Sequence, residues 1–172
     1  MCIRDSLERF LIAADQVKAQ QIVRICGDNP LIDRQLMRLL IRAHLKENAD
    51  YTITPDPIPL GTGTEVIKIK ALKGIAGTTT EPKYREHVTT WFHDNPAALV
   101  QSRVPAPAYL INKPHRLTVD TRSDLTLMEK IFDEFYTPAS PLLDLEKVIQ
   151  FLDAHPDISK INADTPQKNW RS

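Results

Sequence analysis

One aspartate of the sequence stands where an apolar run ends in a turn. Residues 22–26 are rich in β-branched side chains and predict a buried strand, which Gly27 ends and Asp28 follows. Asp33 then stands where the N-cap of the next helix is expected. A carboxylate at the C-terminal end of a buried parallel strand lies at the rim where open α/β sheets hold ligands. Mg²⁺ usually takes only one or two such ligands from a protein, so Asp28 is a candidate metal ligand, with a turn cap as the equal alternative.

A second aspartate repeats this arrangement further along the chain. The apolar-leaning run 115–119 predicts a strand, Asp120 follows it, and Thr121 with Asp124 forms a capping box at the start of a helix. If the two strands lay side by side, both carboxylates would meet at one divalent cation. The same pattern also occurs in α/β proteins that bind nothing at this position, so a purely structural role stays open for both acids.

The elements that must position these acids alternate along the chain. Residues 7–17, 33–48, 71–76, 81–93, 121–136 and 144–154 predict helices, and residues 22–26, 51–54, 65–69, 99–104 and 115–119 predict strands. Prolines and glycines predict a long irregular loop between residues 55 and 63. This alternation predicts an α/β sandwich with a partly parallel sheet.

Length and charge limit the function classes. The 172 residues suffice for one domain with a sizeable core, and 22 Lys and Arg balance 22 Asp and Glu. This balance gives no argument for nucleic acid or an anionic membrane as partner, and no apolar run is long enough to span a bilayer. Cys2 and Cys26 do not form a disulfide framework. These features predict a cytoplasmic protein.

Three segments of the sequence match a known family in order and spacing. They read R-I-C-G-D-N-P-L-I-D at 24–33, Y-R-E-H-V-T at 84–89 and R-L-T-V-D-T at 116–121. Together they resemble the cytidylyltransferases of the spore-coat polysaccharide biosynthesis protein F type, which are relatives of the CMP-sialic acid and CMP-ketodeoxyoctonate synthetases. The resemblance runs from about residue 7 to residue 155.

The resemblance implies a Rossmann-like three-layer α/β/α nucleotide-diphospho-sugar transferase fold. It also implies transfer of CMP from CTP to a sugar or sugar acid for surface-polysaccharide biosynthesis, with Mg²⁺ as cofactor. A homodimer is compatible with these expectations. Asp28 and Asp120 would then be catalytic, metal-binding carboxylates. His87 would position or deprotonate the sugar hydroxyl as a further catalytic group. The residues expected to bind substrate are Arg24, Gly27, Glu65, Arg85 and Glu86.

These assignments have plainer alternatives. Arg85 and Glu86 also fit the solvated face of a helix, and His87 fits a hydrogen-bonded packing role. Glu65 matches the acidic position of a family loop that faces the sugar, although the Arg and Asp of that loop are replaced here, and a solvated loop fits nearly as well. His44 and His155 are expected on helix surfaces.

The sequence departs from the family at its start. A Gly- and Arg-rich loop of the form A-R-x-G-S-x-R-L-P-x-K, which would cradle the triphosphate, is not found. Residues 1–6 are interpreted as a non-native leader, residues 7–155 as a partial domain lacking its N-terminal strands and nucleotide loop, and residues 156–172 as a flexible tail. The isolated chain is expected to aggregate or stay partly unfolded and to bind CTP poorly.

Two other functions fit the same pattern. One is a glycosyltransferase of related fold that consumes a nucleotide sugar. The other is a non-catalytic relative that binds a nucleotide or a partner protein. The upstream R-x-x-x-R-L-P-x-K pattern would favour nucleotidyl transfer over glycosyl transfer, and the presence of both Asp28 and Asp120 speaks against the non-catalytic relative.

Overall fold

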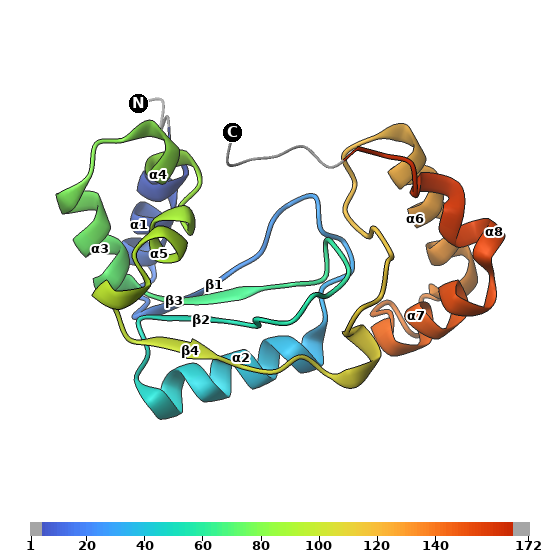
Figure 1. Cartoon of the computed structure of the whole chain (residues 1–172), viewed down its shortest axis with the longest axis horizontal. Coiled ribbons are helices and arrows are strands. Elements are labelled where there is room, and N and C mark those ends of the chain that lie inside the picture. Colours follow the sequence, from blue (N-terminus) through green and yellow to red (C-terminus); the bar gives the residue numbers. More distant parts are fainter. Residues whose placement is uncertain (1–4, 167–172) are drawn as a thin grey trace. The chain divides into compact units, whose positions relative to one another are not determined.

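The computed structural model describes residues 5–166, whose elements are labelled in Figure 1. The chain divides into two compact units, which we describe separately. The first unit comprises Met1–Arg24, Met37–Pro55 and Thr64–Pro105. The second unit comprises Ile25–Leu36, Asp56–Gly63 and Ala106–Ser172.

The first unit contains the sheet. Its strands are β1 (Gln21–Arg24), β2 (Tyr51–Ile53), β3 (Glu65–Lys68) and β4 (Gln101–Arg103), in the spatial order β1-β3-β2-β4. The strand β3 pairs antiparallel with β1 and β2, whereas β4 pairs parallel with β2. The helices of this unit are α1 (Ser6–Gln16), α3 (Ile69–Thr78), α4 (Pro82–Glu86), α5 (Thr90–Asp94), the short η1 (Pro96–Ala98) and most of α2 (Arg34–Glu47).

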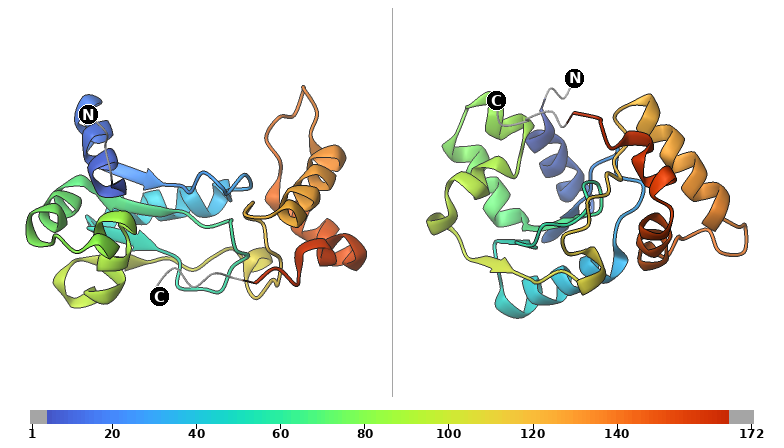
Figure 2. Two further views of the ribbon diagram at one scale, coloured as in Figure 1. Left: turned by 90° about the horizontal axis from the view of Figure 1, so that it is seen from above. Right: turned by 45° about the vertical axis from the view of Figure 1, so that its right-hand side comes forward.

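Helices cover both faces of this sheet (Figures 1 and 2). On one face, Tyr51 and Ile67 of neighbouring strands pack in an apolar cluster with Leu7, Leu72 and Phe92 from the helices. On the other face, α2 directs His44 to the strands, where its Nδ1 lies 2.8 Å from the hydroxyl of Thr52. Successive side chains of a strand point to opposite faces of the sheet, so the strands pack against one helical layer on each face. The predicted α/β class is confirmed.

The second unit is built from helices and loops. Its helices are α6 (Arg122–Phe135), α7 (Leu145–Ala154), α8 (Pro156–Ser159) and the 3₁₀ turns η2 (Ala108–Leu110) and η3 (Lys160–Asn162). Apolar side chains at helical spacing on α6 and α7 are buried, among them Leu127, Ile131, Val148 and Leu152. No helix among residues 5–166 is long and apolar enough to cross a membrane.

Most helices predicted from caps and periodicity are confirmed. Asp5 caps α1 by accepting from the Glu8 N–H, and Asp33 accepts from the Leu36 N–H at the start of α2. The predicted helix at 81–93 is wrong in one respect, because it breaks between α4 and α5. Residues 88–90 are all buried, which one face of a surface helix does not allow, and all three are β-branched.

Two predicted strands differ from the structure. The strand β1 ends at Arg24, is half-buried and runs antiparallel to its partner, so the predicted buried parallel strand is wrong. The run 115–119 forms no regular strand. It is extended, but its backbone partners lie on two separate loops: the Leu117 N–H donates to Leu60 O over 2.7 Å and the Val119 N–H donates to Asp28 O over 2.9 Å.

The segment after Pro156 is more regular than an aperiodic tail. It forms α8 and η3, and Asn162 is buried. Of the predicted leader, Asp5 and Ser6 belong to the start of α1. Residues 1–4 and 167–172 lie outside the described residues.

Candidate active site

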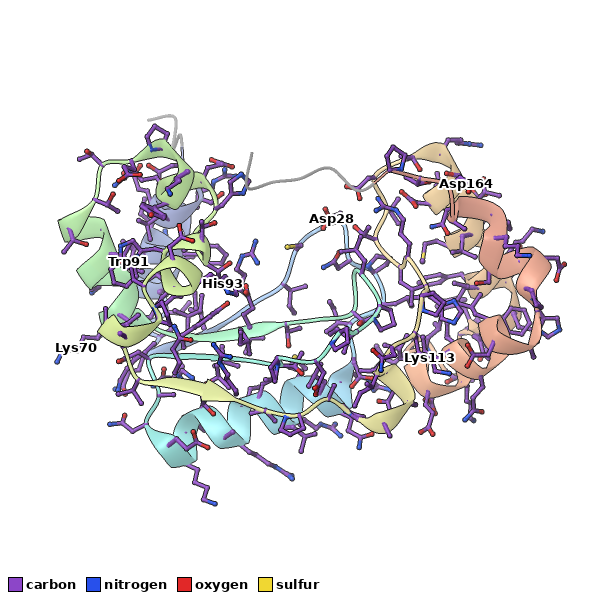
Figure 3. All side chains as sticks on the ribbon, in the orientation of Figure 1. Asp28, Lys70, Trp91, His93, Lys113 and Asp164 are labelled. Atoms are coloured by element: carbon purple, nitrogen blue, oxygen red, sulfur yellow. The ribbon has the colours of Figure 1, made fainter. Side chains whose placement is uncertain are left out.

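Asp28 lies in the tight turn that follows β1, labelled in Figure 3. Its side chain is exposed, whereas its backbone is fixed. The Asp28 carbonyl accepts a hydrogen bond from the Val119 N–H at 2.9 Å and one from the Thr118 hydroxyl at 3.4 Å. The turn is thus held directly against the residue that precedes Asp120.

Asp120 immediately precedes Thr121, the N-cap of α6, in the same unit. Its side chain is half exposed, at 49%, and its Oδ2 lies 2.5 Å from the Arg116 Nη2. The structure therefore brings the two predicted acids onto adjacent backbone segments. The sequence suggested that each would end a parallel strand of the sheet. Instead, both lie on loops whose backbones hydrogen-bond to each other.

Asp124 organises the turn that carries Asp120. Thr121 and Asp124 form the predicted capping box, and the fully buried Asp124 carboxylate also accepts from the N–H groups of Asp120 and Thr121 at 3.0 and 2.9 Å. The Arg116 Nε donates to it at 2.9 Å and the Asn162 amide at 2.7 Å. Burial alone raises the pKa of Asp124, but these donors outweigh it and hold the pKa far below its usual range.

The donor set at Asp28 and Asp120 suits a hard cation that keeps other ligands. Within residues 5–166, no group of three or more His, Cys, Asp or Glu side chains is placed to hold a metal. A zinc site would require such a group, whereas Mg²⁺ is commonly held by one or two carboxylates and by substrate phosphates. Two exposed carboxylates on neighbouring loops therefore fit Mg²⁺ better than zinc.

Arg24 and Glu65 form a cross-strand pair in the first unit. They are register partners of β1 and β3, and the Arg24 Nη1 lies 2.7 Å from the Glu65 Oε2. The other carboxylate oxygen of Glu65 accepts a hydrogen bond from the Tyr51 hydroxyl. Because both oxygens have partners within the unit, Glu65 is part of an internal network as well as a predicted substrate residue.

His93 completes this network, which the sequence did not predict (Figure 3). Its Nε2 lies 3.2 Å from the Tyr51 hydroxyl oxygen and 3.9 Å from Glu65 Oε1. The Tyr51 hydroxyl donates to Glu65, so a hydrogen bond between its oxygen and the His93 ring requires the tautomer that carries the proton on Nε2. Burial raises the pKa of Glu65, but His93, the Arg24 charge and Tyr51 together lower it, while burial and the Glu65 charge raise the pKa of Tyr51.

The three predicted residues around α4 occupy different environments. The Arg85 Nη2 lies 2.7 Å from the Asp5 Oδ2, and Glu86 accepts from the Ser6 hydroxyl at 3.3 Å. Both side chains therefore tie α4 to the start of α1. His87 is exposed at the C-terminal end of α4. Gly27 belongs to the Asp28 turn, and a Cβ placed on it would meet nothing within 4 Å.

A Ser-His-Asp arrangement in the second unit has a structural explanation. The His115 ring lies 2.9 Å from the Ser159 Oγ and 3.0 Å from the Asp153 Oδ1, and Lys113 bonds the other oxygen of Asp153. Only 4% of the His115 side chain is exposed, so its ring is enclosed by these contacts. The arrangement joins the segment 113–116 to α7 and α8.

One buried histidine, His44, gave little signal of its burial in the sequence. His44 was expected on the surface, yet it is 1% exposed and bonds to Thr52 and Gln21. Burial and the nearby Lys68 charge lower its pKa. The position of His44 on the inner stripe of its helix, four residues after Leu40, was the available clue.

Comparisons with known proteins agree on one family. Residues 2–153 match the cytidylyltransferase family. The chain is 36% identical over 171 residues to an uncharacterised protein of Methanocaldococcus jannaschii, covering 98% of this chain and 68% of that protein. It is 31% identical over 152 residues to the spore coat polysaccharide biosynthesis protein SpsF of Bacillus subtilis, covering 88% and 62%.

A solved structure supports the fold. A cytidylyltransferase from Leptospira borgpetersenii serovar Hardjo-bovis superposes with a TM-score of 0.82 at 21% identity, covering 96% of this chain and 68% of the other. The chain thus spans about two thirds of the length of these proteins. The match over most of the chain, together with the two relatives, establishes that the chain belongs to the cytidylyltransferase family.

Proposed function

We propose that the protein is an Mg²⁺-dependent cytidylyltransferase that transfers CMP from CTP to a hydroxyl of a sugar or sugar acid. The observation that carries the proposal is the backbone bond from Val119 to the Asp28 carbonyl, because it fixes Asp28 beside Asp120 within one unit. The family membership supports nucleotidyl transfer as the reaction class. The similarity to a protein of polysaccharide biosynthesis supports a sugar acceptor.

In this reaction the sugar oxygen attacks the α-phosphorus of CTP, and pyrophosphate leaves. Asp28 and Asp120 would hold the cation, which when bound neutralises charge on the phosphoryl oxygens. The buried Asp124 carboxylate would keep the Asp120 turn rigid, because it accepts hydrogen bonds from the N–H groups of both Asp120 and Thr121. His87 stays a candidate for contact with the acceptor hydroxyl, since its side chain is exposed.

The test is pyrophosphate release from CTP by the full-length protein with Mg²⁺ and a panel of sugars and sugar acids. Asp28→Asn and Asp120→Asn should each lose at least about a hundredfold in turnover, since each removes a carboxylate ligand from the cation that would neutralise the developing negative charge. Asp133→Asn is the matched control, because Asp133 is an exposed aspartate on α6 of the same unit. Circular dichroism of each variant should match the parent.

Two results would refute the proposal. Near-normal turnover in both variants would remove the two acids from the reaction. Consumption of a nucleotide sugar without release of pyrophosphate from CTP would instead identify a glycosyltransferase, the rival with the related fold.

A further inference from the structure

The guanidinium group of Arg116 contacts two carboxylates of very different character. Its Nε lies 2.9 Å from Asp124 Oδ1, and its Nη2 lies 3.3 Å from Asp124 Oδ2 and 2.5 Å from Asp120 Oδ2. Asp124 is fully buried, Arg116 is 11% exposed at its side chain, and Asp120 is 49% exposed. The Arg116 guanidinium thus joins a buried carboxylate, Asp124, to a surface carboxylate, Asp120.

The two contacts differ in how easily they break. Asp124 is fully buried, and Arg116 is its ion-pair partner, so separating the two would leave a buried charge without a counter-ion even though Asn162, Thr121 and two backbone N–H groups also donate to it. For the Asp120 carboxylate, Arg116 is the one partner found among residues 5–166. A half-exposed ion pair of this kind contributes little and exchanges readily with water or another cation.

We propose that Arg116 is a latch on the metal site: it pairs with Asp120 when no cation is bound, yields Asp120 Oδ2 to an incoming divalent cation, and stays anchored on Asp124. This inference rests on the proposed function, since it assumes that Asp120 is a metal ligand. The guanidinium and the cation compete for the same oxygen and repel each other at close range. Arg116 is a positioning residue, because it acts through Asp120.

The latch affects a bare cation and a nucleotide-bound cation differently. Competition from Arg116 weakens the site for a bare divalent cation. A cation that arrives with a triphosphate brings oxygen ligands and negative charge of its own, and its binding is opposed less. The site is therefore tuned to accept the metal together with the nucleotide, which agrees with the preference of Mg²⁺ for few protein ligands and several phosphate oxygens.

The test measures binding of Mn²⁺ alone, by electron paramagnetic resonance without nucleotide. Arg116→Lys keeps a positive charge against the buried Asp124 but has no planar fork that spans two carboxylates. We expect this variant to bind Mn²⁺ about two- to fivefold more tightly than the parent, as removal of an exposed ion pair allows. Lys113→Gln is the control, because it removes a different cation of the same unit, one that pairs with Asp153, and it should leave Mn²⁺ affinity unchanged.

Unchanged or weaker Mn²⁺ binding in Arg116→Lys would overturn the latch. A failure of the proposed function would look different: Asp28→Asn and Asp120→Asn would then bind Mn²⁺ as the parent does, which would remove the cation site itself. Detection of Mn²⁺ in Arg116→Lys with none in the parent would support the latch in its strongest form.

A second measurement covers the case in which Arg116→Lys does not fold. In the parent protein, Mg²⁺ is added while the ¹H–¹⁵N signals of the Arg116 side chain are followed by nuclear magnetic resonance. The Nη signals should shift and exchange faster with water as Asp120 is released, and the Nε–H signal should persist because of its bond to Asp124. Mg²⁺-induced shifts of the Asp28 and Asp120 amides without any change at Arg116 would contradict the proposal.

Discussion

Replacement of Gly61 by alanine tests the contact on which the position of Asp120 depends. Gly61 has a φ of +93°, a conformation that a side chain disfavours. A Cβ at this position would lie 2.5 Å from both the carbonyl carbon of Leu117 and the nitrogen of Thr118. Because both neighbours are backbone atoms, no side-chain rotation relieves the collision, and the segment that leads to Asp120 must move.

The expected loss follows from these two causes. A left-handed conformation costs a non-glycine residue about 1–2 kcal/mol. Displacing packed neighbours costs about 1–3 kcal/mol more, as for overpacked cores. Alanine also restricts the unfolded chain, which offsets about 0.4–1 kcal/mol. We therefore expect Gly61→Ala to lower the free energy of unfolding by about 2–4 kcal/mol, a large part of the total for a domain.

The assay is urea unfolding of the full-length protein, followed by far-ultraviolet circular dichroism. Gly74→Ala is the matched control, because Gly74 lies inside α3 and a Cβ there meets nothing within 4 Å. This control should raise the free energy of unfolding by about 0.5–1 kcal/mol, since alanine suits a helix interior better. If Gly61→Ala were as stable as the parent, the close approach of the loop to Leu117 and Thr118 would not exist.

Three further changes test the Glu65 network, the buried Asp124 and the exposed His87. Tyr51→Phe should lower the free energy of unfolding by about 1–2 kcal/mol, because it removes a buried donor to Glu65; Tyr84→Phe, whose exposed hydroxyl bonds Asp94, should change it little, and equal effects would dismiss the network. Since the pKa of Asp124 is lowered in the folded state, its contribution to stability is present above the ordinary value of 3.8 and is lost as the pH falls below it. Asp124→Asn should therefore flatten the acid side of the stability profile and cost about 3–5 kcal/mol at neutral pH, and an unchanged acid slope would refute this origin. His87→Ala should raise the KM for the acceptor sugar or lower turnover, because the exposed His87 side chain is the candidate contact for the acceptor hydroxyl, whereas unchanged kinetics would return it to a role outside the reaction.

The sequence predicted the elements that depend on near neighbours. Caps at Asp33 and Thr121 and the 3.6-residue spacing of apolar side chains set the main helices, and both signals lie within a few residues of each other. The failures concern partners that are distant in sequence. The run 115–119 alternates like a strand, but its backbone partners lie on two loops around residues 60 and 28, and no local pattern specifies that choice.

The candidate site divides in the same way. The positions of Asp28 and Asp120 after apolar runs were visible in the sequence, and the structure brings them together by a backbone bond. The sequence showed Asp124 only as part of a capping box. Its further partners, Arg116 and Asn162, come from either side of α6, and burial of the carboxylate cannot be read from a cap motif. The Glu65 network required the register of three strands and the position of α5.

Both acids of the site are positioned through backbone groups, and this separates folding from cation binding. Asp28 is held through its carbonyl by Val119 and Thr118, and no side-chain hydrogen bond of its carboxylate is found among residues 5–166. Asp120 is held through its N–H by the buried Asp124 and through its carboxylate by Arg116. Hydrogen bonds of backbone groups thus set the positions of both residues. Neutralising either carboxylate should therefore spare the fold while removing the ligand, which is why loss of turnover in a well-folded Asp28→Asn protein is a direct test of the chemistry.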